Sequence, residues 1–175
     1  MLFTRAEVEE GLLALVDDLV ASGVTSAIYV VGGAAIMLPV EREALTNDVD
    51  VLHSSAEIQA SARRVGAAKR WPETWLNDAA KMWTSHYDRD DDWEIRFTRG
   101  DFSVRVAQPL LLLAMKLLAG RGQRDAMDID LLLEECRIGS LSDAVAVFDK
   151  YYPTERIAPR ALSQLHERFE RTEHP

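Results

Sequence analysis

The residues that most restrict what this chain can fold into are Ala27–Val31, an uninterrupted apolar run, AIYVV, rich in β-forming side chains. Such a run has no alternating polar face, which is typical of a strand buried on both faces of a sheet. Gly32 and Gly33 follow at once, and glycine permits the backbone conformations that tight turns require. The sequence therefore predicts a buried strand that ends in a tight turn.

Helical patterns dominate the two ends of the chain, and strand patterns dominate its middle. Thr4 and Glu7 form a capping box, and the apolar spacing after them predicts a helix that ends at Gly23. Further strands are expected at 49–52, 93–97 and 102–106, and helices at 34–38, 55–65, 109–119, 123–136, 141–151 and 160–170. This order predicts an α/β (α+β) fold, with a mixed-sheet core over residues 1–107 and a helical region, 108–175, packed on it.

Composition restricts the class of protein. The chain has 175 residues, one cysteine (Cys136) and a net charge of −9. One cysteine excludes an internal disulfide framework and fits a reducing compartment. No apolar run approaches the roughly 20 residues of a membrane helix, and the charged start resembles no signal peptide. A cytoplasmic protein without a membrane partner is expected, and the acidic total argues against a sequence-specific DNA binder.

Two aspartates, Asp48 and Asp50, stand one residue apart within LTNDVDVL, residues 45–52. Side chains alternate along a strand, so these carboxylates share a face, about 6–7 Å apart at Cα, while Val49 and Val51 point to the core. Two unpaired carboxylates at this spacing repel, and a divalent cation turns that repulsion into coordination. The pattern predicts a site for Mg²⁺ (or Mn²⁺). The alternative is a polar strand end that faces solvent.

The glycine pair Gly32-Gly33 adds a second chemical element. Glycines between a buried strand and a helix let backbone N–H groups approach a phosphate closely. By itself VVGGAA is equally typical of a simple tight turn, and it lacks the patterns of a dinucleotide fold or a P-loop. The glycine pair and the acidic strand together predict a site for a metal-bound phosphate.

These two elements, Gly32-Gly33 and Asp48-Val49-Asp50-Val51, resemble the signature of the nucleotidyltransferase superfamily related to DNA polymerase β. Relatives often carry an arginine and a threonine before the acidic strand. This chain keeps Thr46, but Ala44 stands where the arginine would be. The resemblance implies that Asp48 and Asp50 hold the metal and that Gly32, Gly33 and Thr46 contact the nucleotide.

The C-terminal half narrows the resemblance. The segments LLLLAMKLLAGR, 110–121, and QRDAMDID, 123–130, are similar to the Lys and Arg-Asp-x-x-Asp motifs of AbiEii/MenT-type nucleotidyltransferases, which include toxins of bacterial toxin–antitoxin pairs. The segment WLNDA, 75–79, is similar to a motif of small relatives in that group. The resemblance implies that Lys116 and Arg124 bind the nucleotide, and that Asp125 or Asp128 orients it or receives a proton.

The residues of this second half allow plainer interpretations. Lys116 could lay its aliphatic stem on the core and keep its amine in water. Asp125 and Asp128 lie three residues apart, on one face of a helix, and could form an ion-pair network with Arg121 and Arg124 that joins two helices.

The resemblance implies transfer of a nucleoside monophosphate from a nucleoside triphosphate to an acceptor hydroxyl. The acceptor could be a tRNA end or a protein side chain, and the chain could be a toxin with a cognate antitoxin. The alternative is a catalytically inactive scaffold of the same fold that acts as a binding protein or antitoxin. A third carboxylate is expected near the metal, with Asp78 and Glu94 as candidates.

Overall fold

A computed structural model of the chain describes residues 1–39 and 45–173, apart from the side chains of Arg124 and of residues 171–173. Ala44 therefore lies outside the described residues. The fold is mixed α/β, as the sequence predicts. The chain forms two compact units: Met1–Met82 with Trp93–Ala107, and Trp83–Asp92 with Gln108–Pro175.

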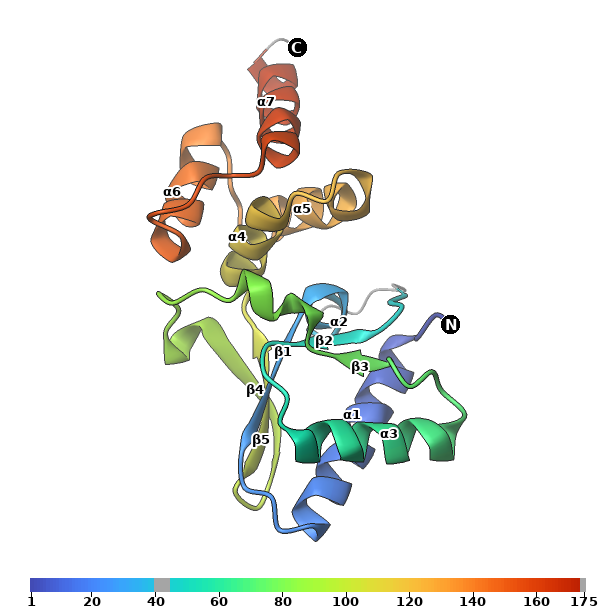
Figure 1. Ribbon diagram of the computed structural model, residues 1–175. Coiled ribbons are helices and arrows are strands. Elements are labelled where there is room, and N and C mark those ends of the chain that lie inside the picture. The colour runs from blue at the N-terminus through green and yellow to red at the C-terminus, as the bar shows by residue number, and fades with distance from the viewer. Residues whose placement is uncertain (40–44, 174–175) are drawn as a thin grey trace. The chain divides into compact units, whose positions relative to one another are not determined.

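The first unit is built on one five-stranded sheet in the order β3-β2-β1-β5-β4 (Figure 1). Its middle strand, β1 (Ala27–Val31), pairs antiparallel with β2 (Val49–Val51) and parallel with β5 (Phe102–Ala107). On the outer sides, β3 (Leu76–Asn77) runs parallel to β2, and β4 (Trp93–Arg99) runs antiparallel to β5. The predicted strands are confirmed, and β4 and β5 form a hairpin. β3 was not predicted, because two residues are too few to show an alternating pattern.

Two long helices of the first unit, α1 (Arg5–Ala21) and α3 (Ala56–Lys69), pack together against the sheet (Figure 1). The predicted capping box begins α1: the Thr4 hydroxyl accepts from the backbone N–H of Glu7 (3.3 Å), and the Glu7 carboxylate accepts from the backbone N–H of Thr4 (2.8 Å). The short helix α2 (Gly32–Met37) follows β1 without a break. The sequence pattern therefore predicts the helices of this unit to within a few residues.

The two faces of the sheet differ in character. The face toward α1 and α3 carries the aliphatic core, whose strand residues are Ile28, Val30, Val49, Val51, Val104 and Val106. On the other face Val31 is buried, but Ala27 and Tyr29 are partly exposed. The prediction that β1 is buried on both faces is therefore wrong at these two residues. The apolar pattern counts Tyr29 as buried because of its ring, but the hydroxyl of a tyrosine can remain in contact with water.

The second unit is helical, and its helices are α4 (Pro109–Ala119), α5 (Gln123–Glu135), α6 (Leu141–Tyr151) and α7 (Pro159–Glu173). All four were predicted, with bounds within a few residues of these. Gly120 ends α4 in the left-handed conformation (φ +52°), as is common after a helix. α4 contacts each of the other three helices, so its nearly uninterrupted apolar sequence is explained by burial within this unit.

The acidic run Asp88–Asp92 contains one residue that the sequence analysis missed. Asp92 is buried, and its carboxylate accepts hydrogen bonds from the Tyr151 hydroxyl (2.5 Å), the Lys150 ammonium (3.0 Å) and the backbone N–H of Arg89 (2.9 Å). Burial alone would raise the pKa of this carboxyl, but these hydrogen bonds outweigh it and lower the pKa. Asp92 therefore fixes the segment 83–92 to α6.

We expect Asp92→Asn to lower the free energy of unfolding by about 1–3 kcal/mol at neutral pH, because a buried charge-assisted network loses its acceptor. The native pKa of Asp92 lies below the ordinary value of about 3.9, so its contribution is complete above that pH and is lost as the pH falls through the native pKa. Urea unfolding from pH 7 to pH 3, followed by circular dichroism, measures both effects.

The matched control is Asp91→Asn, which removes an exposed carboxylate from the same turn. Equal unfolding free energies for the two variants at pH 7 would contradict the role assigned to Asp92.

Candidate functional site

The candidate site of the first unit begins where β1 turns into α2. Gly32 has a φ of +68°, and a Cβ placed on it would lie 2.5 Å from Oδ2 of Asp50. Asp50 lies opposite Val31 in the antiparallel pair of β1 and β2, which brings its carboxylate over the glycine. Gly32 is therefore required twice, for its backbone conformation and for the space that the Asp50 carboxylate occupies.

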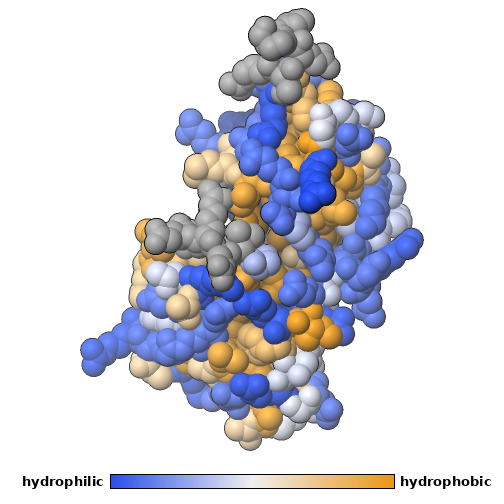
Figure 2. All heavy atoms as spheres, turned by 180° about the vertical axis from the view of Figure 1, so that it is seen from behind, coloured by the Kyte–Doolittle hydropathy of each residue, from blue (hydrophilic) through white to orange (hydrophobic). Residues whose placement is uncertain are grey.

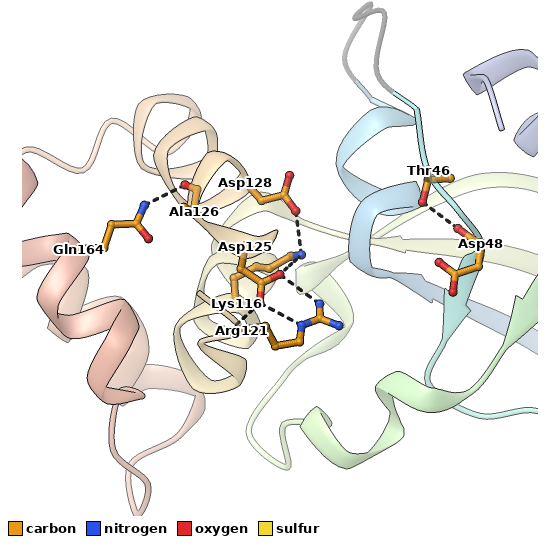
Figure 3. Close-up of polar contacts among 8 residues, drawn as sticks. All are labelled: Thr46, Asp48, Lys116, Arg121, Asp125, Ala126, Asp128 and Gln164. Atoms are coloured by element: carbon orange, nitrogen blue, oxygen red, sulfur yellow. Dashed lines mark hydrogen bonds and ion pairs between the residues drawn. The ribbon is translucent and has the colours of Figure 1, made fainter. Parts of the chain in front are cut away.

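Thr46 and Asp48 continue this site along the chain. A Cβ on Gly33 would lie 3.0 Å from the hydroxyl oxygen of Thr46. That hydroxyl donates to the backbone carbonyl of Asp48 (2.9 Å; Figure 3), and the backbone of Thr46 exchanges two hydrogen bonds with Phe3. The segment before β2 is thus held by the N-terminal residues, and the glycine pair lies against both Thr46 and Asp50.

Asn77 belongs to the same site, and the sequence analysis did not assign it a role. It pairs with Asp50 across β2 and β3, and its side-chain N–H₂ donates to Oδ2 of Asp48 (3.1 Å). Its side-chain oxygen accepts from the backbone N–H of Ala79 (2.9 Å), which fixes the orientation of the amide. The available signal was the WLNDA segment, in which the asparagine adjoins the candidate Asp78.

The donor set of this site is of the kind that Mg²⁺ binds together with waters and phosphate oxygens. Asp48 and Asp50 have partly exposed carboxylates on one face, and Mg²⁺ commonly binds one or two protein carboxylates together with waters and phosphate oxygens. Within residues 1–39 and 45–173, no group of three or more His, Cys, Asp or Glu side chains gathers to hold a metal. The carboxylates would therefore hold a metal together with substrate, and they do not form an all-protein cage.

Among the described residues, neither Asp78 nor Glu94 gathers with Asp48 and Asp50 into a group of three that could hold a metal. Asp78 forms an ion pair with Lys81 (3.3 Å). Glu94 lies opposite Val106, whose side chain is on the helix-covered face, and its strand β4 is three strand spacings from β2, about 14 Å. The register therefore separates Glu94 from Asp50.

Substitution of Gly32 tests the close approach of Asp50. We expect Gly32→Ala to lower the free energy of unfolding by more than Gly100→Ala. Gly100 also has a positive φ (+53°), but no atom lies within 4 Å of its Cβ position, so its substitution adds only the backbone cost of about 1–2 kcal/mol. Urea unfolding of both variants measures the difference. A Gly32→Ala variant no less stable than Gly100→Ala would show that the Asp50 carboxylate does not occupy that space.

The second unit brings Lys116, Asp125 and Asp128 together, as Figure 3 shows. Lys116 is buried in α4, and its ammonium lies 2.8 Å from a carboxylate oxygen of Asp125 and 2.8 Å from one of Asp128. Arg121 binds Asp125 through its guanidinium (3.0 and 3.1 Å) and its backbone N–H (3.1 Å). The snorkelling interpretation of Lys116 is wrong, because its amine ends inside an ion-pair network and not in water.

The two carboxylates of this network differ in their surroundings. Asp125 has no exposed surface and accepts four hydrogen bonds, whereas the Asp128 side chain is 32% exposed. Burial alone would raise the pKa of Asp125, but the hydrogen bonds from Arg121 and Lys116 outweigh it and lower the pKa. The geometry therefore suits Asp125 to orienting Lys116 and not to receiving a proton. The side chain of Arg124 lies outside the described residues.

We expect Asp125→Asn to lower the free energy of unfolding by about 3–5 kcal/mol, because it leaves the buried Lys116 ammonium with one carboxylate in place of two. Asp128→Asn removes the half of the network that reaches solvent and is expected to cost about 1 kcal/mol or less. Thermal unfolding at matched pH and salt measures both variants. Equal losses would mean that the burial of Asp125 contributes nothing to this network.

Comparison with models of protein families, with curated proteins and with solved structures finds no significant match to this chain. Across the described residues, no helix is long and apolar enough to cross a membrane. Figure 2 shows hydrophilic side chains over much of the visible face, with hydrophobic ones interspersed among them. A function must therefore be argued from the residues of the two clusters themselves.

Proposed function

We propose that the chain is a Mg²⁺-dependent nucleotidyltransferase of the polymerase-β-related superfamily, AbiEii/MenT type. The observation that supports this most is the close packing of the acidic pair on the glycine pair. The Asp50 carboxylate lies over Gly32, the Thr46 hydroxyl lies against Gly33, and Asn77 holds Asp48. Carboxylates that would bind a cation thus adjoin the backbone that would approach a phosphate.

In this proposal Asp48 and Asp50 hold Mg²⁺, which supplies neutralisation of the phosphate charge when bound. The backbone at Gly32 and Gly33, with Thr46, positions the nucleoside triphosphate. The oxygen of an acceptor hydroxyl forms a bond to the α-phosphorus as the bond from that phosphorus to its bridging oxygen breaks. Pyrophosphate leaves, and the hydroxyl proton passes to solvent. The residues act by positioning and by charge complementarity.

The cluster of the second unit has a role in the same proposal. From the resemblance alone, Lys116 is proposed to bind nucleotide phosphate, because its ammonium is a point charge of the kind that suits phosphate. Asp125 binds that ammonium and is itself bound by Arg121, and Asp128 binds the ammonium at the exposed side of the network. For Arg124, a role in binding the nucleotide is proposed on the basis of the resemblance alone.

The proposed acceptor is a hydroxyl of a tRNA end or of a protein, and the proposed setting is the bacterial cytoplasm. Modification of a tRNA end would arrest translation, so the chain would act as the toxin of a toxin–antitoxin pair.

A second candidate is a scaffold of the same fold that binds a partner without catalysis. The observation in its favour is that neither Asp78 nor Glu94 joins Asp48 and Asp50 in the described part of the chain. Calorimetry with Mg²⁺ and each of the four nucleoside triphosphates separates the candidates. Metal-dependent binding of a nucleotide favours the enzyme, and binding of none favours the scaffold.

We expect Asp48→Asn to reduce nucleotide transfer by a factor of about 100 or more, because the neutral amide weakens the metal site, while the fold persists. The assay incubates the chain with labelled nucleoside triphosphates and total cellular RNA and protein, and asks which fraction becomes labelled. Asp101→Asn, an exposed carboxylate in the β4–β5 turn, is the matched control. Wild-type turnover of Asp48→Asn would falsify the assignment.

A further inference from the structure

The register of the sheet places further side chains on the face that carries Asp50. Val31 lies opposite Asp50, and Tyr29, two residues earlier on β1, lies opposite Arg105 on β5. Residues directly opposite each other point to the same face, and so do residues two apart on one strand. Asp50, Tyr29 and Arg105 therefore share a face, and α1 and α3 cover the other one.

Arg105 contacts an aromatic ring on this face. The Arg105 guanidinium carbon lies 5.9 Å from the centre of the Tyr29 ring, within the range of a cation–π contact. The Tyr29 ring in turn packs edge-on against Trp93, with ring centres 4.9 Å apart. Trp93 is buried, whereas Tyr29 and Arg105 are only partly so. The guanidinium thus contacts one ring of an aromatic pair, and the Arg105 side chain is partly exposed.

The distance between Arg105 and the acidic pair suits a triphosphate. Two strand spacings across the sheet and two residues along it separate the Cα atoms of Arg105 and Asp50, about 12 Å in all. Both side chains extend from the same face of the sheet. A polyphosphate that bound through Mg²⁺ at Asp48 and Asp50 and ran along this face toward β5 would meet the guanidinium.

The charge at this position also argues for phosphate. On β5, the neighbour of β1 on the side away from β2, the residues of this face are Ser103, Arg105 and Ala107, and none of them is acidic. The positive charge of Arg105 would repel a further metal ion. A guanidinium instead binds phosphate oxygens in a planar, two-bond geometry. The face therefore combines one acidic pair for a cation with one fixed cation for an anion.

We propose that Arg105 binds the β- and γ-phosphates of the nucleoside triphosphate, so that this unit carries its own cation for the phosphates. This inference rests on the proposed function and adds a residue to its site. Tyr29 and Trp93 act as positioning residues that hold the guanidinium toward the acidic pair.

The test is calorimetric binding of nucleoside triphosphate, diphosphate and free nucleoside, each with Mg²⁺, to the full chain and to Arg105→Gln. We expect Arg105→Gln to weaken binding of the triphosphate and the diphosphate by about ten- to a hundredfold, the effect of a lost charge-assisted hydrogen bond. Binding of the free nucleoside is expected to stay within about twofold of the wild-type value, because it has no phosphate for Arg105 to bind.

Two more variants serve as a control and as a substitute in this test. Arg96→Gln removes a guanidinium from the same hairpin, but Arg96 pairs with Glu9 of α1 (2.5 Å), so nucleotide affinity should not change. Arg105→Lys keeps the charge and the stem if Arg105→Gln does not fold, and it should weaken triphosphate binding by about three- to tenfold, because an ammonium cannot make the two-bond contact.

The outcomes separate the two proposals. Failure of the unaltered chain to bind any nucleoside triphosphate overturns both the proposed function and this inference. Tight binding by the wild type with equal affinity in Arg105→Gln, or in Arg105→Lys where that variant is used, overturns the inference alone. An equal loss for nucleoside and triphosphate also overturns it, because that result assigns Arg105 to packing.

Discussion

The pairing of β1 on both of its sides decides which side chains of the first unit meet. Its antiparallel partner β2 sets Asp50 opposite Val31, and its parallel partner β5 sets Arg105 opposite Tyr29. Because side chains alternate, a shift of one residue in either pairing would send these polar groups into the core under α1 and α3. The hydrophobic face of β1 thus fixes the register, and the register fixes the site.

Local patterns were enough to predict most elements of the fold. The capping box at Thr4, the strands expected at 93–97 and 102–106 and the helix expected at 109–119 each depend on neighbouring residues alone, and each is found in the structure. The sequence pattern failed to predict β3, which has only two residues, and it predicted Tyr29 to be buried because of its aromatic ring. Both failures have one cause: only the neighbours in the sheet decide whether such residues pair or are buried.

Some residues of the candidate site could also be predicted from local sequence, and others could not. The residue types and spacing of Gly32, Gly33, Asp48 and Asp50 predicted that they would act together, and the glycine contacts are consistent with that. Asn77 and Arg105 come from strands far along the chain, and their place on the Asp50 face depends on strand order and register. Asp92 stands in the acidic run Asp88–Asp92, and such a run is typical of an exposed loop. Its contacts with Lys150 and Tyr151 could not be read from local sequence.

The division into two compact units has a consequence for how the chain is made. Each unit is assembled from two separate stretches, so the chain passes from one unit to the other after Met82, Asp92 and Ala107. During synthesis Asp92 leaves the ribosome well before Tyr151 and Lys150, so its carboxylate stays hydrated until α6 has been translated. The second unit therefore completes its folding late, and a gene split after Ala107 would give two polypeptides that could complete it only by reassociating.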